Sequence, residues 1–364
     1  MSEYQFYDFL AVDRPLSAED RADLRRISSR ARITASGFTN SYSWGDLKAN
    51  PRAMMARWFD VHVYLSNWNT RSLMLRLPRA LVDLPLLGRC IAGSEDVTLS
   101  DAGEALILEV TRQELDDEGW IEDDPPHLAA LAPLRAEFLG GDPRLGMLLW
   151  LLGVDDEAVA DDAPEPVAGL GPLLPSTEFF AAMFRLDPDL VAAAAERPAQ
   201  PGPALSAAAL TARIEALPRA ERTGFLLRAA EGDPYVGAAL RRRLHGPADA
   251  PAPRNAGELR ARAAALGEER RRVAAEREAA ARRVRLDALA ARGEAAWAEV
   301  DAAIARRNAG GYQQALAVLA ALRELAADRG TLAAFAARLA ALRARTTRLS
   351  SLRAGLDAFA AGGE

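Results

Sequence analysis

The stretch NPRAMMARWFDVHVYLSNW, residues 50–68, decides the fold of the N-terminal part, because it is compatible with either a helix or a strand. The segment VHVYL on its own is compatible with a strand. Large apolar residues nevertheless recur at spacings of four and three, at Met54, Trp58, Val61, Leu65 and Trp68. Asn50 suits a helix N-cap and Pro51 suits the first turn. The pattern therefore predicts one helix across the stretch.

The segments on either side predict further strands and helices. YQFYDFLAVD, residues 4–13, is apolar on both faces and predicts an interior strand, while Ser17 and Asp20 form an approximate capping box for a helix. Further elements are predicted at ITASGFTNSYSW (a strand or irregular ribbon), RSLMLRLP (a strand), RALVDLPLL (a short helix) and VTLSDAGEALILEV (a hairpin). This order predicts a small α+β domain over residues 1–112.

A helical subdomain is predicted over residues 113–246. Two acidic segments that contain prolines, 112–126 and 153–172, enclose two predicted helices hinged at Gly140 and Gly141. Short amphipathic helices follow. The composition of PADAPAPRNA, residues 247–256, is typical of a linker.

The remaining part, residues 256–364, is rich in arginine and alanine. One helix over residues 256–307 would be about 78 Å long, although Gly267 and Gly293 count against an unbroken rod. Two further helices separated by AGG resemble the hairpin of a tetratricopeptide unit, with Trp297 two residues too far upstream. The fold class predicted for the whole chain is mainly α, with an N-terminal α+β domain, a helical subdomain, and a long helix with this hairpin.

Composition excludes several classes of protein. The 364 residues are 50% hydrophobic, which suits packed cores rather than disorder. No signal-like start and no run of some 18 uncharged apolar residues occurs, so we expect a cytoplasmic protein without a membrane partner. One cysteine and three histidines are too few for a usual zinc site, and we expect no metal and no cofactor. Cys90 lies in an apolar segment and should be buried and inert.

Charge is distributed unevenly along the chain. The net charge is -6, but the part from Ala256 onward carries 19 arginines against 13 acidic residues and is +6. Only Lys48 supplies lysine, so the many arginines are typical of a high-GC coding bias. Arginine abundance alone is therefore weak support for phosphate binding.

The segment GEERRRVAAEREAAARRVRLDALAARGEAAW, residues 267–297, is the one candidate surface for nucleic acid. Its phosphate-binding candidates are Arg270, Arg271, Arg272, Arg282, Arg283 and Arg285. Acidic residues are interleaved with them, often four positions ahead of an arginine, which favours a solvated, self-paired helix. Apolar residues also recur at seven, at Leu259, Leu266, Val273 and Ala280, but the complementary heptad positions are only partly apolar. A weak homodimer, packing on the chain's own domain, and docking of a partner protein all remain open.

A polar cluster in the N-terminal part is a speculative ligand site. Its candidate residues are Asp46, Asn67, Asn69 and Arg71, where the arginine would hold an anion. The alternative is that NWNTR forms only a helix end and turn. An enzyme would require a deep pocket that joins this turn to Asp46 or Asp60.

Four stretches together resemble a family of uncharacterised bacterial proteins. They are YQFYDFLAVDRPLS, ITASGFTNSYSWGDLK, RWFDVHVYLSNWNTRSLMLRLP with its NWNTRSLMLRLP segment, and YQQALAVLAALRELA in the tail. Such proteins are similar to those encoded beside SWIM zinc-finger proteins. The resemblance implies a protein partner or one associated with nucleic acid, and it assigns no role to any residue.

The leading hypothesis is a non-enzymatic scaffold or adaptor that docks another protein through its helical tail. The alternative is an accessory protein in nucleic-acid transactions that uses the arginine-rich helix. A second alternative is an unrecognised enzyme with a site in the N-terminal domain.

Overall fold

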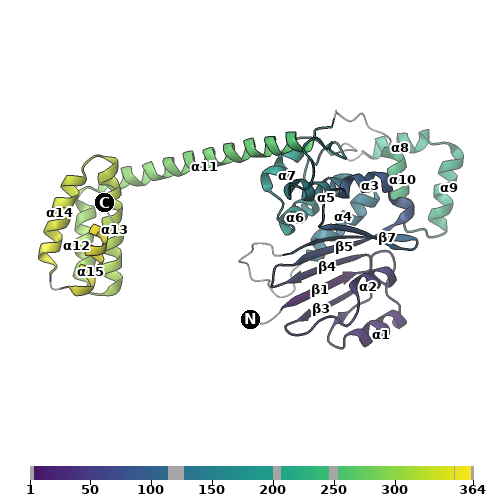
Figure 1. Ribbon diagram of the computed structural model, residues 1–364, viewed down its shortest axis with the longest axis horizontal. Coiled ribbons are helices and arrows are strands. Elements are labelled where there is room, and N and C mark those ends of the chain that lie inside the picture. The colour runs from purple at the N-terminus through teal and green to yellow at the C-terminus, as the bar shows by residue number, and fades with distance from the viewer. Residues whose placement is uncertain (1–3, 114–126, 200–205, 246–252, 348, 362–364) are drawn as a thin grey trace. The chain divides into compact units, whose positions relative to one another are not determined.

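The computed structural model describes residues 4–113, 127–199, 206–245, 253–347 and 349–361 (Figure 1). The chain divides into two compact units, Met1–Gly267 and Glu268–Glu364. The first unit includes the ranges 1–112 and 113–246, which the sequence suggested as two domains. The acidic segment 114–126 and most of the predicted linker lie outside the described residues.

The first unit is built on a seven-stranded antiparallel sheet with strand order β2-β3-β1-β4-β5-β7-β6. The strands are β1 (Gln5–Leu10), β2 (Arg32–Ile33), β3 (Gly37–Tyr42), β4 (Val61–Ser66), β5 (Arg71–Pro78), β6 (Val97–Ala102) and β7 (Ala105–Arg112). Strand β1 pairs with β3 on one side and β4 on the other, which confirms the predicted interior strand. The predicted hairpin is β6 and β7.

The prediction of one helix over residues 50–68 was wrong. Helix α2 (Pro51–Arg57) does begin as predicted, because the Asn50 side chain accepts a hydrogen bond from the Ala53 N–H and Pro51 occupies the first turn. The chain then becomes extended, and β4 lies between β1 and β5. Val61 and Val63 are fully buried there. β-branched residues suit that environment. Pairing with the two neighbouring strands therefore determined the conformation, and the helical spacing of the apolar residues was accidental.

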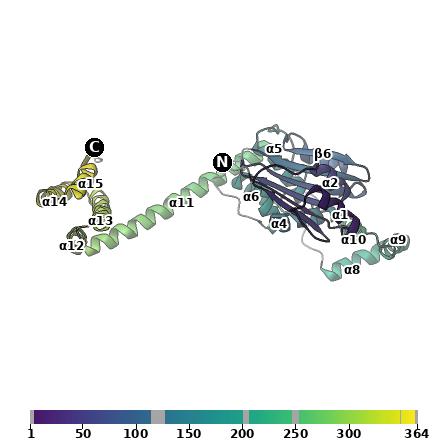
Figure 2. The same ribbon diagram turned by 90° about the horizontal axis from the view of Figure 1, so that it is seen from below.

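Helices cover both faces of the sheet (Figure 2). Helices α1 (Ala18–Ile27) and α2 share one core with strand residues, among them Phe9 and Phe38. The predicted capping box of Ser17 and Asp20 is present at α1. The opposite core holds η1 (Arg79–Leu81) and helices α3 (Leu84–Ile91), α4 (His127–Leu139), α5 (Arg144–Asp155), α6 (Pro175–Met183) and α7 (Pro188–Ala195).

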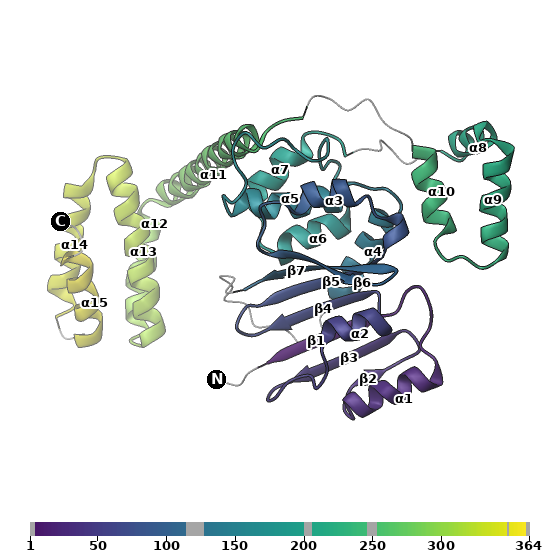
Figure 3. The same cartoon turned by 45° about the vertical axis from the view of Figure 1, so that its right-hand side comes forward.

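Three shorter helices also belong to the first unit: α8 (Ala207–Ala216), α9 (Arg219–Ala230) and α10 (Val236–His245) (Figure 3). Helix α10 contacts α8, α9 and α4. The predicted break at Gly140 and Gly141 separates α4 from α5, as expected. None of the described helices combines the length and apolar content that crossing a membrane requires.

The second unit is helical. Helix α11 (Ala256–Arg292) begins in the first unit, runs through Gly267 into the second, and ends before Gly293, whose φ is +51°, so the helix does not continue to residue 307. It is followed by α12 (Glu294–Ala305), α13 (Ala309–Asp328), α14 (Leu332–Arg345) and α15 (Ser350–Ala361). Val300, Leu319 and Leu339 belong to one apolar core. Helices α12 and α13 pack together as the predicted hairpin; its likeness to a tetratricopeptide unit remains a prediction.

Candidate functional site

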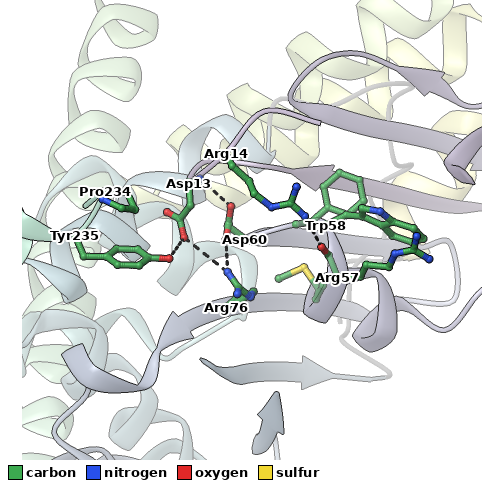
Figure 4. Close-up of a pocket in the computed structure, with 10 residues that line it drawn as sticks. Asp13, Arg14, Arg57, Trp58, Asp60, Arg76, Pro234 and Tyr235 are labelled. Atoms are coloured by element: carbon green, nitrogen blue, oxygen red, sulfur yellow. Dashed lines mark hydrogen bonds and ion pairs between the residues drawn. The ribbon is translucent and has the colours of Figure 1, made fainter. Parts of the chain in front are cut away.

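Charged residues gather where three strands of the sheet end on the same side (Figure 4). Asp13 lies just after β1, Asp60 just before β4, and Arg76 near the end of β5. Neighbouring strands run in opposite directions, so the end of β1 and the end of β5 both meet the start of β4. The Arg76 N–H donates to the Asp60 carbonyl oxygen at 2.9 Å, which fixes the two residues side by side.

Asp60 anchors this end of the sheet. Its side chain is only 4% exposed. One carboxylate oxygen accepts from the backbone N–H groups of Val12 and Asp13 at 2.8 and 2.9 Å, and the other accepts from Arg76 Nη1 at 3.2 Å. These bonds occupy the carboxylate, which therefore supports the loop after β1.

Arg135 of α4 crosses to the same cluster from the helical layer. Its side chain is 4% exposed, and its two Nη atoms donate to the two carboxylate oxygens of Asp13 at 2.8 and 2.6 Å. Its Nε donates to the carbonyl oxygen of Arg76 at 2.6 Å. This bidentate geometry is the strong form of an arginine–carboxylate pair.

Tyr235 completes the cluster by donating to Asp13 Oδ2 at 2.6 Å. Burial alone would raise the pKa of Asp13, but the hydrogen bonds from Arg135 and Tyr235 outweigh it and hold that pKa below its usual value. Burial, with the hydrogen bond to Asp13, raises the pKa of Tyr235 to about 12. Asp13 is thus held as a carboxylate and Tyr235 as a neutral phenol at neutral pH.

A cavity of about 240 Å³ lies beside the cluster. Its lining residues are Asp13, Arg14, Met55, Arg57, Trp58, Phe59, Asp60, Arg76, Pro234 and Tyr235. Figure 4 shows Trp58 and Arg57 at one end of this lining and Pro234 and Tyr235 at the other, with Asp13, Asp60 and Arg76 between them. The site is therefore a small amphipathic pocket at the end of the sheet.

Arginine side chains near the cavity differ in how fully they are engaged. The Nε of Arg76 is buried with no hydrogen-bond partner among the described residues. Arg14 donates to the Arg57 carbonyl oxygen at 2.9 Å and reaches Asp20 only at 3.4 Å. The Arg57 guanidinium pairs with Asp23 at 2.5 Å. Arg14 and Arg76 thus retain donors, whereas Arg57 is paired with Asp23, a carboxylate that it shares with Arg26.

The four residues of the predicted ligand cluster lie elsewhere. Asp46 accepts from the Tyr7 hydroxyl at 2.6 Å, and Asn67 Oδ1 accepts from the Tyr4 N–H at 2.9 Å. Asn69 has a φ of +60° in the turn between β4 and β5, and Arg71 donates to the Met183 carbonyl oxygen at 2.8 Å. None of the four lines the cavity described above; Asp60, which the enzyme hypothesis gave as the alternative to Asp46, does line it.

The arginines of α11 show two kinds of environment. Arg272 pairs with Glu269 and Glu276 at 2.6 and 2.8 Å, and Arg282 pairs with Glu324 at 2.5 Å. Arg270 is exposed. Arg271, Arg283 and Arg285 are exposed and have no ion pair within the described ranges. At 100° per residue these six arginines spread over roughly 220° of the helix circumference rather than along one narrow face.

The apolar heptad positions of α11 differ in how deeply they are buried. Leu259 is fully buried in the core of the first unit, with Leu266 packed against it. Val273 is half-buried, Ala280 is exposed and Val284 is 69% exposed. The segment from residue 268 to residue 285, which we call the exposed α11 segment, therefore presents apolar side chains without a covering element.

The remaining residues singled out by sequence have structural surroundings. Cys90 is buried, as predicted, and burial raises the pKa of its thiol to about 12. Within the described residues, no three His, Cys, Asp or Glu side chains are grouped so as to hold a metal ion. No protein-family model, no curated protein and no solved structure matches this chain.

Proposed function

We propose that this chain is a non-enzymatic scaffold or adaptor that docks a partner protein along the exposed α11 segment. One observation carries the proposal: Val273, Ala280 and Val284 repeat at seven and four on a helix surface that the described residues leave open. A helix of the partner with the same repeat would bury them. The family resemblance adds a SWIM zinc-finger protein as the candidate partner. The tetratricopeptide-like hairpin α12–α13 would present a second surface in the same cytoplasmic complex.

The charges around this apolar stripe support a protein partner over a polyanion. Acidic residues stand between the arginines, and Arg272 and Arg282 are already neutralised by Glu269, Glu276 and Glu324. A phosphate backbone favours an uninterrupted basic face. A mixed surface instead suits interhelical ion pairs of both signs with another protein.

Point substitutions in the full chain test docking. Truncation before α11 would remove Leu259 and Ala263 from the core of the first unit and damage its fold. We expect a tagged V273D/V284D double variant to recover at least about tenfold less partner from a lysate of the native bacterial host than wild type does, because two charges would be buried unpaired. V12D is the matched control, since Val12 is 53% exposed in the first unit.

The partner should be recovered equally with and without nuclease, and it should be the same protein in repeated captures. Equal recovery by wild type and V273D/V284D would contradict docking along the exposed α11 segment. Loss of binding in V12D to the same extent would show that the effect is not specific to α11.

Nucleic-acid binding is the second candidate, and it rests on Arg271, Arg283 and Arg285 having no ion pair within the described ranges. In that case affinity for duplex DNA should fall steeply as salt rises, and R283E/R285E should flatten that dependence. R26E is the control, because Arg26 is an exposed arginine of the first unit paired with Asp23. Salt-independent or undetectable binding would exclude this candidate.

A further inference from the structure

The cavity at the ends of β1, β4 and β5 takes no part in the docking proposed above. Its acceptors are already occupied: Asp60 receives bonds from Val12, Asp13 and Arg76, while Asp13 receives bonds from Arg135 and Tyr235. Its donors are not. The Nε of Arg76 is buried with no described partner, and Arg76 donates only one side-chain hydrogen bond within the described residues. The Arg76 side chain is 27% exposed and lines the cavity, so the guanidinium N–H groups that make no hydrogen bond are available to a ligand that accepts from them.

The charge balance selects the kind of acceptor. Ion pairs around the cavity join five arginines to only four carboxylates, which leaves one positive charge in excess: Arg14, Arg26, Arg57, Arg76 and Arg135 share Asp13, Asp20, Asp23 and Asp60. Asp20 compensates Arg14 only through a contact of 3.4 Å. One excess positive charge suits a monoanion, while the nearby carboxylates of Asp13 and Asp60 repel a dianion such as a phosphate monoester. A guanidinium binds a carboxylate through two parallel hydrogen bonds.

The apolar side chains of the lining define the rest of the ligand. Met55, Trp58, Phe59 and Pro234 line the cavity and provide an apolar surface. The Trp58 indole is fixed because its Nε1 donates to Asp20 at 3.0 Å and the Arg57 guanidinium lies 4.4 Å from its ring centre. A volume of about 240 Å³ lies below the 300–1,000 Å³ of pockets for drug-sized ligands, so the ligand is small.

We propose that this cavity binds a small organic monocarboxylate, whose carboxylate is held by Arg76 and Arg14 and whose apolar body packs on Met55, Trp58 and Phe59. The site is independent of the exposed α11 segment. It would make the first unit a ligand-binding domain within an interaction protein. Failure of partner docking and failure of ligand binding are therefore separate results.

Isothermal titration calorimetry of the full-length protein at neutral pH tests the proposal with benzoate and phenylacetate. Benzamide and phenylacetamide are their uncharged counterparts, and inorganic phosphate is the dianion. We expect at least one carboxylate to bind one to one, about tenfold or more tightly than its amide, because a charged hydrogen bond to arginine is lost in the amide.

Two variants locate the binding. R76K keeps the charge but removes the Nε donor and the forked geometry, and it should weaken carboxylate binding about tenfold or more. R14Q tests the same carboxylate at a side chain that is 57% exposed, where folding is not at risk. R79K is the matched control, because Arg79 lies three residues after Arg76 and pairs with Asp101 away from the cavity.

The proposal is overturned if neither carboxylate shows saturable binding at millimolar concentration. It is also overturned if phosphate binds more tightly than both carboxylates, or if R14Q and folded R76K bind them as wild type does. Equal weakening by R79K would place the binding outside this cavity.

Discussion

Arg135 shows how a single buried residue connects two layers of the fold. Its guanidinium leaves water almost completely, yet hydrogen bonds to Asp13 and to the Arg76 carbonyl oxygen replace the lost hydration. The desolvation free energy of such a buried charge is offset only while its hydrogen-bonding partners are present. The network therefore makes the packing of α4 on the sheet sensitive to one side chain.

Removing this guanidinium should destabilise the first unit strongly. In R135M the carboxylate of Asp13 loses its main cation and Asp60 keeps only Arg76, and we expect a loss of about 3–5 kcal/mol in the free energy of unfolding by urea. R26A is the control, because Arg26 is 75% exposed and its pair with Asp23 should contribute less than about 1 kcal/mol. Wild-type stability in R135M would show that the network is not a structural anchor.

His62 should make stability depend on pH. Its ring is 1% exposed and stacks on Phe9 with centroids 3.8 Å apart, and burial lowers its pKa from 6.5 to about 4. Between these two pKa values His62 is protonated in the unfolded chain but neutral in the folded chain. The contribution of His62 to the free energy of unfolding is therefore fully present above pH 6.5. It falls as the pH drops from 6.5 towards 4, by about 3 kcal/mol in total.

The test is H62F, which keeps an aromatic ring in the stack but has no titrating group. We expect the unfolding free energy of H62F to lose this decline between pH 6.5 and 4, measured by urea titration at several pH values. Above pH 7 both proteins should have pH-independent contributions from this position. An unchanged acid slope in H62F would mean that other groups cause it.

At the scale of secondary structure, sequence predicted those elements whose signals are local. Ser17 with Asp20 and Asn50 with Pro51 mark helix starts through bonds that span three residues, and both are present. The strand at residues 61–66 has no comparable local signal. Its conformation depends on pairing with β1 and β5, and spacing along the chain says nothing about those partners.

The cavity could not be predicted for the same reason. Interpreting residues 50–68 as one helix placed Asp60 in the middle of that helix, although it stands at the start of β4 beside Arg76. Tyr235 bonds to Asp13 across 222 positions of sequence, and no short motif links them. The sequence identified Asp60 as a candidate site residue, but only the strand order brings its partners together.

Two glycine-to-alanine changes should have opposite effects on their elements. Gly293 separates α11 from α12 at a φ of +51°, so G293A should cost the second unit about 1 kcal/mol of unfolding free energy. Gly224 lies inside α9 with no neighbour close to the position of an added Cβ, so G224A should stabilise that helix by up to about 1 kcal/mol. Thermal unfolding measured by circular dichroism compares them, and equal signs would contradict the backbone argument.

At the scale of the whole chain, the division into two compact units predicts two unfolding events. Each unit has its own apolar core, so differential scanning calorimetry should resolve two transitions. R135M should lower the midpoint of one transition and G293A the midpoint of the other. A single transition that both variants shift equally would mean that the units unfold cooperatively.

The burial of helix α5 has a consequence for how the chain folds while it is being synthesised. Every residue from Leu145 to Val154 is buried, which makes this helix the centre of the layer that covers one face of the sheet. A ribosome releases β7 first and needs roughly 2–9 s more to reach Asp155, at 5–20 residues per second. Until α4 and α5 have been synthesised, only η1 and α3 among the described helices can cover this face of the sheet, so the interval between Arg112 and Asp155 is when a chaperone has most apolar surface to protect.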